Sequence, residues 1–273
     1  MKKKYKYTFC LFYRSMLIFL IMITFLSISC YQDVVDLDLS EFDSQIVIEG
    51  IITDQPGPHR VRITRTISYE SSGDFPSVSG AEVVIADDSD YTETLRAFRA
   101  GTYQTDELQG VPGRTYSLSV YVDGEEYTAS CKMPEAVELD SITYNIYGGL
   151  AYLRCVFYDR EGIDDFFRLK IYRNGDLVET YLYQGRFRDG QKIIIDDFIN
   201  PFLLDDQIRI EMFTIDRIIY EYFSMLGEDT DESFVELPDI LSLTAYNPNT
   251  NLSNGALGYF SAQAKRTYTF IVE

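Results

Sequence analysis

The chain has 273 residues, a formal net charge of −19 at pH 7, one histidine and four cysteines. A field this negative repels nucleic acid and anionic lipid headgroups, so we expect neither to be a partner. One histidine is too few for a three-histidine zinc site within a single chain. The length allows one large or two ordinary domains.

The first thirty residues have the parts of a lipoprotein export signal. A basic segment comes first, with Lys2, Lys3, Lys4, Lys6 and Arg14. The apolar run at residues 16–26 follows, and Ser27-Ile28-Ser29 leads into Cys30. A membrane span needs roughly 20 apolar residues, so a transmembrane anchor is the less favoured alternative. We therefore expect residues 1–29 to be a signal peptide and Cys30 to carry the lipid.

A short acidic segment, residues 30–43, follows the lipid site and lacks a strong hydrophobic period. We interpret it as a lipidated tether. The two or three acyl chains of a bacterial lipoprotein would hold it firmly to a membrane, whereas one chain binds only marginally.

Residues 44–133 show short β-type patterns separated by turn residues. Residues 45–53 are rich in Ile and Val, and in residues 60–66 Val61 and Ile63 alternate with Arg60 and Arg62. Asp123-Gly124 suits a type I′ hairpin, because both central residues of that turn need positive φ. These patterns predict an N-terminal β-sandwich over residues 44–133.

A second β-rich unit is predicted for residues 138–273, after a hinge at residues 133–137 in which Pro134 disfavours a central strand. Asn174-Gly175 indicates another hairpin, and residues 255–264 and 266–272 are expected to be two late strands. Within residues 215–226 the apolar residues instead recur at three- and four-residue spacing, which predicts a helix with Asp216 as its N-terminal cap and Gly227 as its stop. The fold class is therefore mainly β, with two β-sandwich-like (immunoglobulin- or transthyretin-like) domains, the second carrying one amphipathic helix.

Cysteine and histidine chemistry is sparse. A Cys131–Cys155 disulfide is compatible with an oxidising envelope, but each residue lies in an apolar strand pattern, so buried free thiols are favoured. His59 lies in the turn Gln55-Pro56-Gly57-Pro58-His59, where we expect a solvent-facing side chain.

No catalytic residue is predicted, because the chain lacks the Gly-x-Ser-x-Gly, Walker A and Gly-x-Gly-x-x-Gly motifs. A glycosidase needs only two carboxylates, so a carboxylate-dependent glycan hydrolase stays an alternative. Four acidic pairs are adjacent, so on a strand their side chains would point to opposite faces, and in a loop they would more often solvate a turn. They are Asp87-Asp88, Asp164-Asp165, Asp196-Asp197 and Asp205-Asp206. No cofactor or metal is expected, although residues 87–90 and 228–232 leave a structural calcium ion as an open alternative.

Five segments resemble the Bacteroidota outer-membrane lipoprotein family called domain of unknown function 4249. They are IVIEGIITD at 46–54, VRITRT at 61–66, FPSVSGAEV at 75–83, GVPGRTY at 110–116 and NGALGYF at 254–260. The first predicted sandwich is also similar to carboxypeptidase-regulatory-like and transthyretin-like modules.

The resemblance implies an outer-membrane location and a TonB-dependent transporter as partner, but no activity and no ligand-binding residues. Acidic residues behind the lipidated cysteine resemble the surface-export signal of Bacteroidota, which favours the cell surface over the periplasmic face. We therefore expect a non-enzymatic accessory or ligand-capture subunit of an uptake system. A stand-alone glycan-binding module or adhesin is the other alternative.

Overall fold

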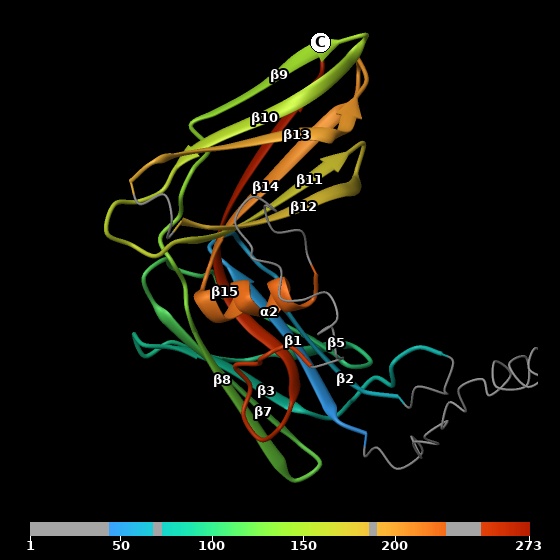
Figure 1. The fold of residues 1–273 in the computed structure, drawn as a ribbon. Coiled ribbons are helices and arrows are strands. Elements are labelled where there is room, and N and C mark those ends of the chain that lie inside the picture. The colour runs from blue at the N-terminus through green and yellow to red at the C-terminus, as the bar shows by residue number, and fades with distance from the viewer. Residues whose placement is uncertain (1–43, 68–72, 186–189, 228–246) are drawn as a thin grey trace, which may run out of the picture. The chain divides into compact units, whose positions relative to one another are not determined.

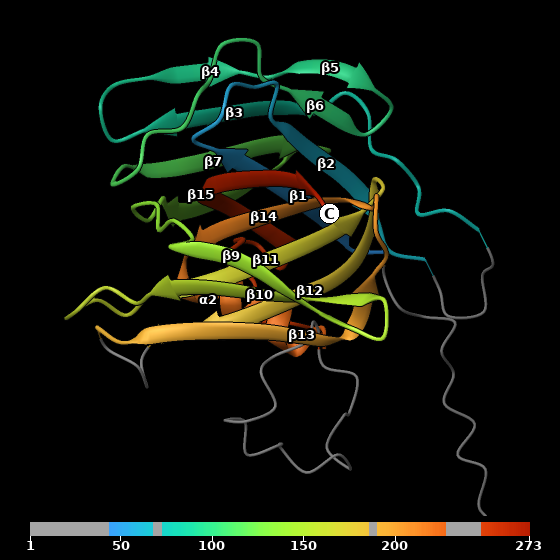
Figure 2. The ribbon, with the colours of Figure 1, turned by 90° about the horizontal axis from the view of Figure 1, so that it is seen from above.

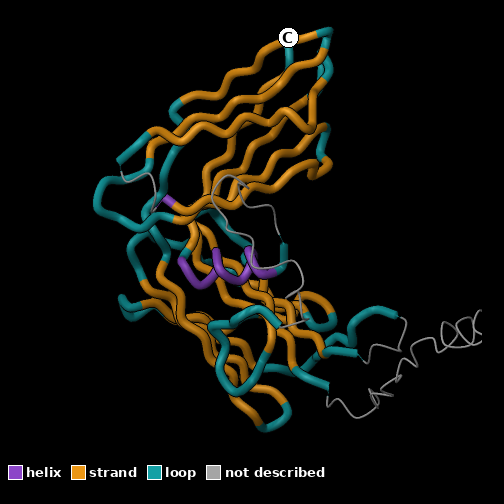
Figure 3. The backbone as a smooth tube through the Cα atoms, in the orientation of Figure 1, coloured by secondary structure: helices purple, strands orange, loops and turns teal. Residues whose placement is uncertain are grey.

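The computed structural model describes residues 44–67, 73–185, 190–227 and 247–273 (Figure 1). The expected signal peptide and the whole tether, including Cys30, lie outside the described residues. Strands dominate the described chain, with a single α-helix among them (Figure 3). The prediction of a mainly β, sandwich-like fold is confirmed.

Eight strands occupy the described residues between 46 and 132. They are β1 (Ile46–Thr53), β2 (Arg60–Arg65), β3 (Glu82–Asp87), β4 (Thr92–Thr94), β5 (Arg96–Arg99), β6 (Thr102–Gln104), β7 (Thr115–Val122) and β8 (Glu125–Lys132). A four-stranded sheet has the order β4-β3-β7-β8, and β1, β2, β6 and β5 belong to a longer sheet.

The remaining elements follow residue 140. They are β9 (Ser141–Tyr147), β10 (Leu150–Tyr158), β11 (Phe166–Arg173), β12 (Asp176–Gln184), β13 (Lys192–Phe202), β14 (Gln207–Ile215), α2 (Arg217–Met225) and β15 (Leu257–Ile271). A three-stranded sheet has the order β13-β10-β9, and Figure 1 shows it lying over β11, β12 and β14.

One eight-stranded sheet runs through both halves of the described chain, in the order β12-β11-β14-β15-β1-β2-β6-β5 (Figure 2). Strand β15 joins the halves because its first half pairs in parallel with β1 and its second half pairs antiparallel with β14. The expectation of two late strands at 255–264 and 266–272 is wrong. The two halves of one 15-residue strand bury their side chains in different cores, which breaks the hydrophobic pattern without breaking the strand.

Glycine makes the parallel pairing of β1 and β15 fit. Gly258 pairs with Ile48 and has a φ of +96°, a region that L side chains avoid. A Cβ on Gly258 would lie 2.9 Å from the carbonyl carbon of Ile48. The strands therefore approach at a point where no side chain fits.

Both predicted hairpin turns are present. Asp123 and Gly124 have φ values of 55° and 84°, and Asn174 and Gly175 have φ values of 52° and 99°. Positive φ at both central residues is the requirement of a type I′ turn.

The buried apolar residues form two clusters. The first combines strands of residues 46–133 with α2 and with Phe260 and Ala262 of β15, and the second begins at Val137 and ends at Val272. The boundary between the two clusters in sequence falls at the predicted hinge, although the first cluster also recruits later elements. The division into domains at 44–133 and 138–273 stays a prediction.

Helix α2 begins as the sequence predicts. The Asp216 side chain accepts a hydrogen bond from the Ile218 N–H at 3.0 Å, and Gly227 follows the last turn with a φ of 76°. Its buried residues Ile219 and Phe223 join the first core, so the apolar face packs on the protein's own sheets.

Candidate functional site

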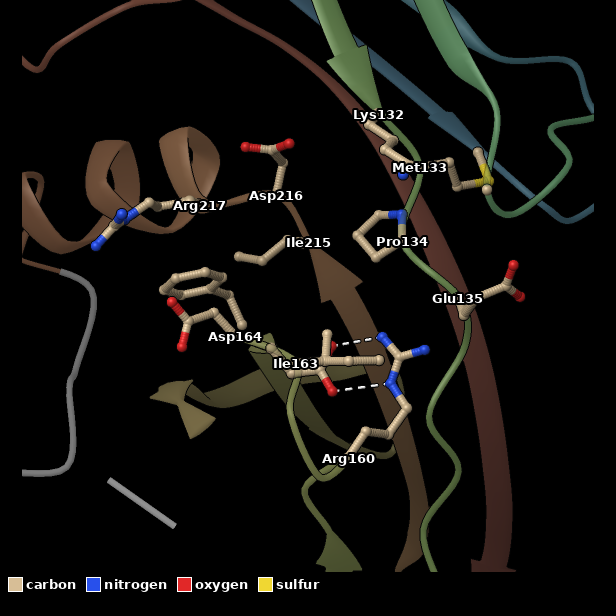
Figure 4. A pocket seen from close by; sticks show the side chains of 13 residues that line it. Lys132, Met133, Pro134, Glu135, Arg160, Ile163, Asp164, Ile215, Asp216 and Arg217 are labelled. Atoms are coloured by element: carbon tan, nitrogen blue, oxygen red, sulfur yellow. Dashed lines mark hydrogen bonds and ion pairs between the residues drawn. The ribbon is translucent and has the colours of Figure 1, made fainter. Parts of the chain in front are cut away.

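A groove of about 480 Å³ lies beside the predicted hinge (Figure 4). Its walls come from the end of β8, the 160–166 loop and the start of α2. The residues that line it are Gly113, Lys132, Met133, Pro134, Glu135, Arg160, Ile163, Asp164, Asp165, Phe166, Ile215, Asp216 and Arg217.

The charges in this hinge groove are mostly used by the fold. Arg160 donates two hydrogen bonds to the buried Asp165 carboxylate, at 2.8 and 2.5 Å. Asp216 caps α2, and Arg217 pairs with Glu221 at 3.3 Å. These ion pairs and the cap hold the hinge and the helix in place, which is a structural role.

Several carboxylates of the adjacent acidic pairs also have structural contacts. Asp87 accepts from Arg114 at 2.6 Å and from the Ser89 and Tyr91 N–H groups, while Asp88 accepts from Thr115. Two further carboxylates serve the second half of the chain. Asp196 pairs with Arg154, and Asp206 accepts from the Leu203 N–H and from Asn174. Asp87 and Asp196 lie on strands, whereas Asp88 and Asp206 lie outside them, and all four carboxylates are bonded within the fold.

A second depression, of about 550 Å³, opens on one face of the long sheet. The cross-strand register places Tyr259, Glu49, Arg62, Thr102 and Arg99 in one row over β15, β1, β2, β6 and β5. Arg60 stands two residues along β2, on the same face as Arg62. We call this surface the arginine face and define it by Glu49, Ile51, Pro58, His59, Arg60, Arg62, Arg99, Thr102 and Tyr259.

The arginines of this face differ from most of the others in the described chain. Arg65, Arg96, Arg114, Arg154, Arg160, Arg209, Arg217 and Arg266 each form an ion pair within 3.3 Å. Among described residues Arg60 and Arg99 have no carboxylate partner, and Arg62 reaches Glu49 only at 3.7 Å. The face therefore carries positive charge that the fold does not neutralise.

His59 lines this face, and its predicted exposure is wrong. Only 7% of the residue is exposed. Its backbone is held by Thr105, whose hydroxyl accepts from the His59 N–H at 2.9 Å and whose N–H donates to the His59 carbonyl. Burial lowers the pKa of His59, against the opposing influence of the Gln55 carbonyl and the Glu93 carboxylate. Its Nε2 is buried without a hydrogen-bond partner in the described part of the chain.

The two cysteines of the described chain are free thiols, as favoured from the sequence. Cys131 and Cys155 are both buried, one in each core. Burial raises the pKa of the Cys131 thiol to about 12, although the Ala262 N–H donates to its sulfur. A thiol with so high a pKa is unreactive at neutral pH.

The arginine face was not singled out from the sequence. Arg60 and Arg62 were assigned to one face of their strand, and that signal is correct. Arg99 lies on a strand whose four residues are all exposed, so no alternation marks it.

No group of three or more potential metal ligands occurs among the described residues. The calcium candidate at residues 228–232 lies outside that part of the chain. Of the described helices, none is long and apolar enough to cross a membrane.

Solved structures with a similar course of strands include the chicken interferon gamma receptor alpha chain, at 7% identity and a TM-score of 0.20, over 63% of this chain and 89% of that one. The FN1-FN3 domains of chicken CNTN1 match at 9% identity and a TM-score of 0.22, over 62% of this chain and 63% of theirs. Comparison with curated proteins finds no match. The model of the family described as "Domain of unknown function (DUF4249)" matches residues 32–269, and the chain therefore belongs to that family.

Proposed function

We propose that the protein is an outer-membrane lipoprotein, anchored through Cys30 and favouring the cell surface, that serves a TonB-dependent uptake system as a non-enzymatic accessory or ligand-capture subunit. The signal at residues 1–30 supports the anchor. One surface feature supports a protein partner, and it lies near the C-terminal end of β15.

Exposed apolar side chains gather at that end. We call this surface the apolar end and define it by Ile146, Tyr147, Leu203, Leu204 and Ile271, which are between 50% and 65% exposed.

Contacts between their segments bring these residues together. Tyr144 of β9 stacks on Phe270 of β15 with ring centroids 6.2 Å apart, and its hydroxyl bonds to the Glu273 backbone. The Asp205 N–H, next to the Leu203-Leu204 turn, donates to the Val272 carbonyl. The tip of the β9–β10 hairpin, the β13–β14 turn and the C-terminus thus meet at one end (Figure 1).

Five half-exposed apolar residues at one end cost solubility without contributing to the core. Clustered apolar side chains with an aromatic among them are typical of protein interfaces. Tyrosine suits such an interface because it buries a large ring and keeps a polar hydroxyl. The apolar end therefore supports a docking role.

Affinity purification of the tagged full-length protein from native outer membranes tests this role. We expect a TonB-dependent transporter to co-purify with the wild type and to be lost from the double variant Tyr147→Ser, Leu204→Ser. The control Val111→Ser, Tyr121→Ser changes exposed apolar residues elsewhere, 41% and 53% exposed, and should retain the transporter. Recovery of no transporter, or equal recovery with both double variants, would contradict the proposal.

The anchor is tested separately with radiolabelled palmitate. Label should enter the wild type and be absent from Cys30→Ala. If the Cys30→Ala protein stays in the membrane fraction without label, the anchor is a transmembrane segment and not a lipid. Protease shaving of intact cells distinguishes the cell surface from the periplasmic face.

The non-enzymatic assignment rests on the buried, lone His59 and on the structural use of the acidic pairs. Incubation of the protein with candidate glycans should give no product. Turnover that a single Asp→Asn or Glu→Gln change abolishes would instead support the hydrolase alternative.

A further inference from the structure

The arginine face stands out against the charge of the whole chain. Acidic residues outnumber basic ones by 43 to 24, and ion pairs hold most arginines of the described chain. Arg60, Arg62 and Arg99 nevertheless share one depression with a single carboxylate, that of Glu49. Three guanidiniums that line one depression repel one another, so gathering them there costs the fold electrostatic free energy.

The strand register places the arginines close enough together for one small ligand to contact more than one of them. Arg62 and Arg99 both pair with Thr102, and neighbouring strands lie about 4.8 Å apart, so their Cα atoms are separated by roughly 10 Å. Thr102 stands between them, and its hydroxyl accepts from Arg99 at 3.4 Å. Arg60 adds a third cation from the next outward-facing position of β2.

Two aromatic rings lie beside the arginines of this face. The Arg60 guanidinium lies over the half-exposed ring of Phe98, with 5.1 Å between its carbon and the ring centroid. Tyr259 lines the depression from the side of β15, where it packs against Tyr222 and Phe223 of α2. Aromatic rings beside polar groups are suited to the faces of sugar rings, which are apolar on one side and carry hydroxyls around the rim.

We propose that the arginine face binds an acidic saccharide, with the guanidiniums of Arg60, Arg62 and Arg99 holding its carboxylate groups. The planar guanidinium fork matches a carboxylate in two parallel hydrogen bonds, which makes arginine the residue suited to this recognition. The depression lies on an open sheet face, and its lining has Ile51 and Pro58 but no enclosed apolar pocket for a peptide side chain. Nucleic acid is opposed by the charge of the rest of the chain.

This inference names the ligand class for the capture role in the proposed function and rests on that role. Its failure is distinguishable, because binding of a saccharide by purified protein does not require a transporter, and co-purification of a transporter does not require the arginine face.

Calorimetric titration of the full-length protein in detergent tests the inference with three probes. Trigalacturonate is the acidic saccharide, its methyl ester removes only the charge, and acetyl-triglycine offers a carboxylate without a sugar. We expect trigalacturonate to bind and the other two to bind at least tenfold more weakly, because a hydrogen bond to a charged group contributes enough for roughly a tenfold change.

The variants Arg60→Gln and Arg99→Gln should each weaken trigalacturonate binding about tenfold. Arg96→Gln is the matched control, because Arg96 lies on the same strand as Arg99 but pairs with Asp106 at 3.0 Å, and it should bind as the wild type does. Circular dichroism confirms that each variant is folded. The inference is overturned by absent trigalacturonate binding, by equal binding of the ester or of the peptide, or by an equal loss in Arg96→Gln.

Discussion

Arg60 of β2 and Phe98 of β5 are in cation–π contact across the intervening strand β6. The ring orients the guanidinium but does not neutralise it, since an aromatic face offers a quadrupole rather than a counter-ion. Within the described residues Arg60 has no carboxylate partner, so its full charge remains available to a ligand.

Replacing Phe98 with alanine should therefore weaken trigalacturonate binding about twofold to fivefold, the factor that an exposed cation–π contact is worth. The free energy of unfolding should change by less than about 1 kcal/mol, because the ring is half exposed. Phe75→Ala is the matched control, with 52% exposure against 50% for Phe98, and should leave binding unchanged. The same loss of binding in both variants would argue against the contact.

Gly258→Ala tests the junction between the two halves of the long sheet. Its Cβ would collide with the backbone of Ile48, so we expect a loss of more than about 3 kcal/mol in the free energy of unfolding, measured with urea. Gly175→Ala has almost the same φ, 99° against 96°, but meets nothing within 4 Å. It should cost only the backbone strain, roughly 1–2 kcal/mol. Equal losses would mean that the close approach of β1 and β15 contributes nothing.

Asp216→Ala removes the side-chain cap of α2 and should cost about 0.5–2 kcal/mol of unfolding free energy. Asp216→Asn keeps a capping oxygen and should recover most of that loss. If the alanine and asparagine variants were equally stable, the cap would be irrelevant to the fold.

His59 gives a direct pH test, because it is the one histidine of the chain and its imidazole signal needs no assignment. Burial depresses its pKa, so the midpoint observed by NMR should lie below 6.5. Because its pKa is lowered, His59 is neutral in the folded protein. Its contribution to the free energy of unfolding is full above pH 6.5 and falls as the pH drops toward the pKa of the folded state. His59→Gln should lack that pH dependence. A midpoint at or above 6.5 would place the side chain in solvent.

The elements that the sequence predicts best are those with local causes. Asp123-Gly124 and Asn174-Gly175 form their turns because the backbone requirement lies in the two residues themselves. Asp216 starts its helix for the same reason.

Features that depend on distant segments were missed. The pairing of β1 with β15 joins residues about 210 positions apart, and no periodic pattern encodes a partner strand. His59 has the sequence of an exposed turn residue, because Thr105, which bonds to its backbone in the fold, lies 46 positions away. The arginine face is likewise assembled from five strands, and β5, which carries Arg99, shows no alternation.

Site-specific photo-crosslinking in native outer membranes tests the proposed docking role most directly. Benzoylphenylalanine replaces Tyr147 at the apolar end in one variant and Tyr121 of β7 in the other, two tyrosines that are 65% and 53% exposed. Irradiation should link the protein to a TonB-dependent transporter from position 147 and not from position 121. Absence of a transporter adduct from position 147, or equal adducts from both positions, would contradict the docking of this protein through its apolar end.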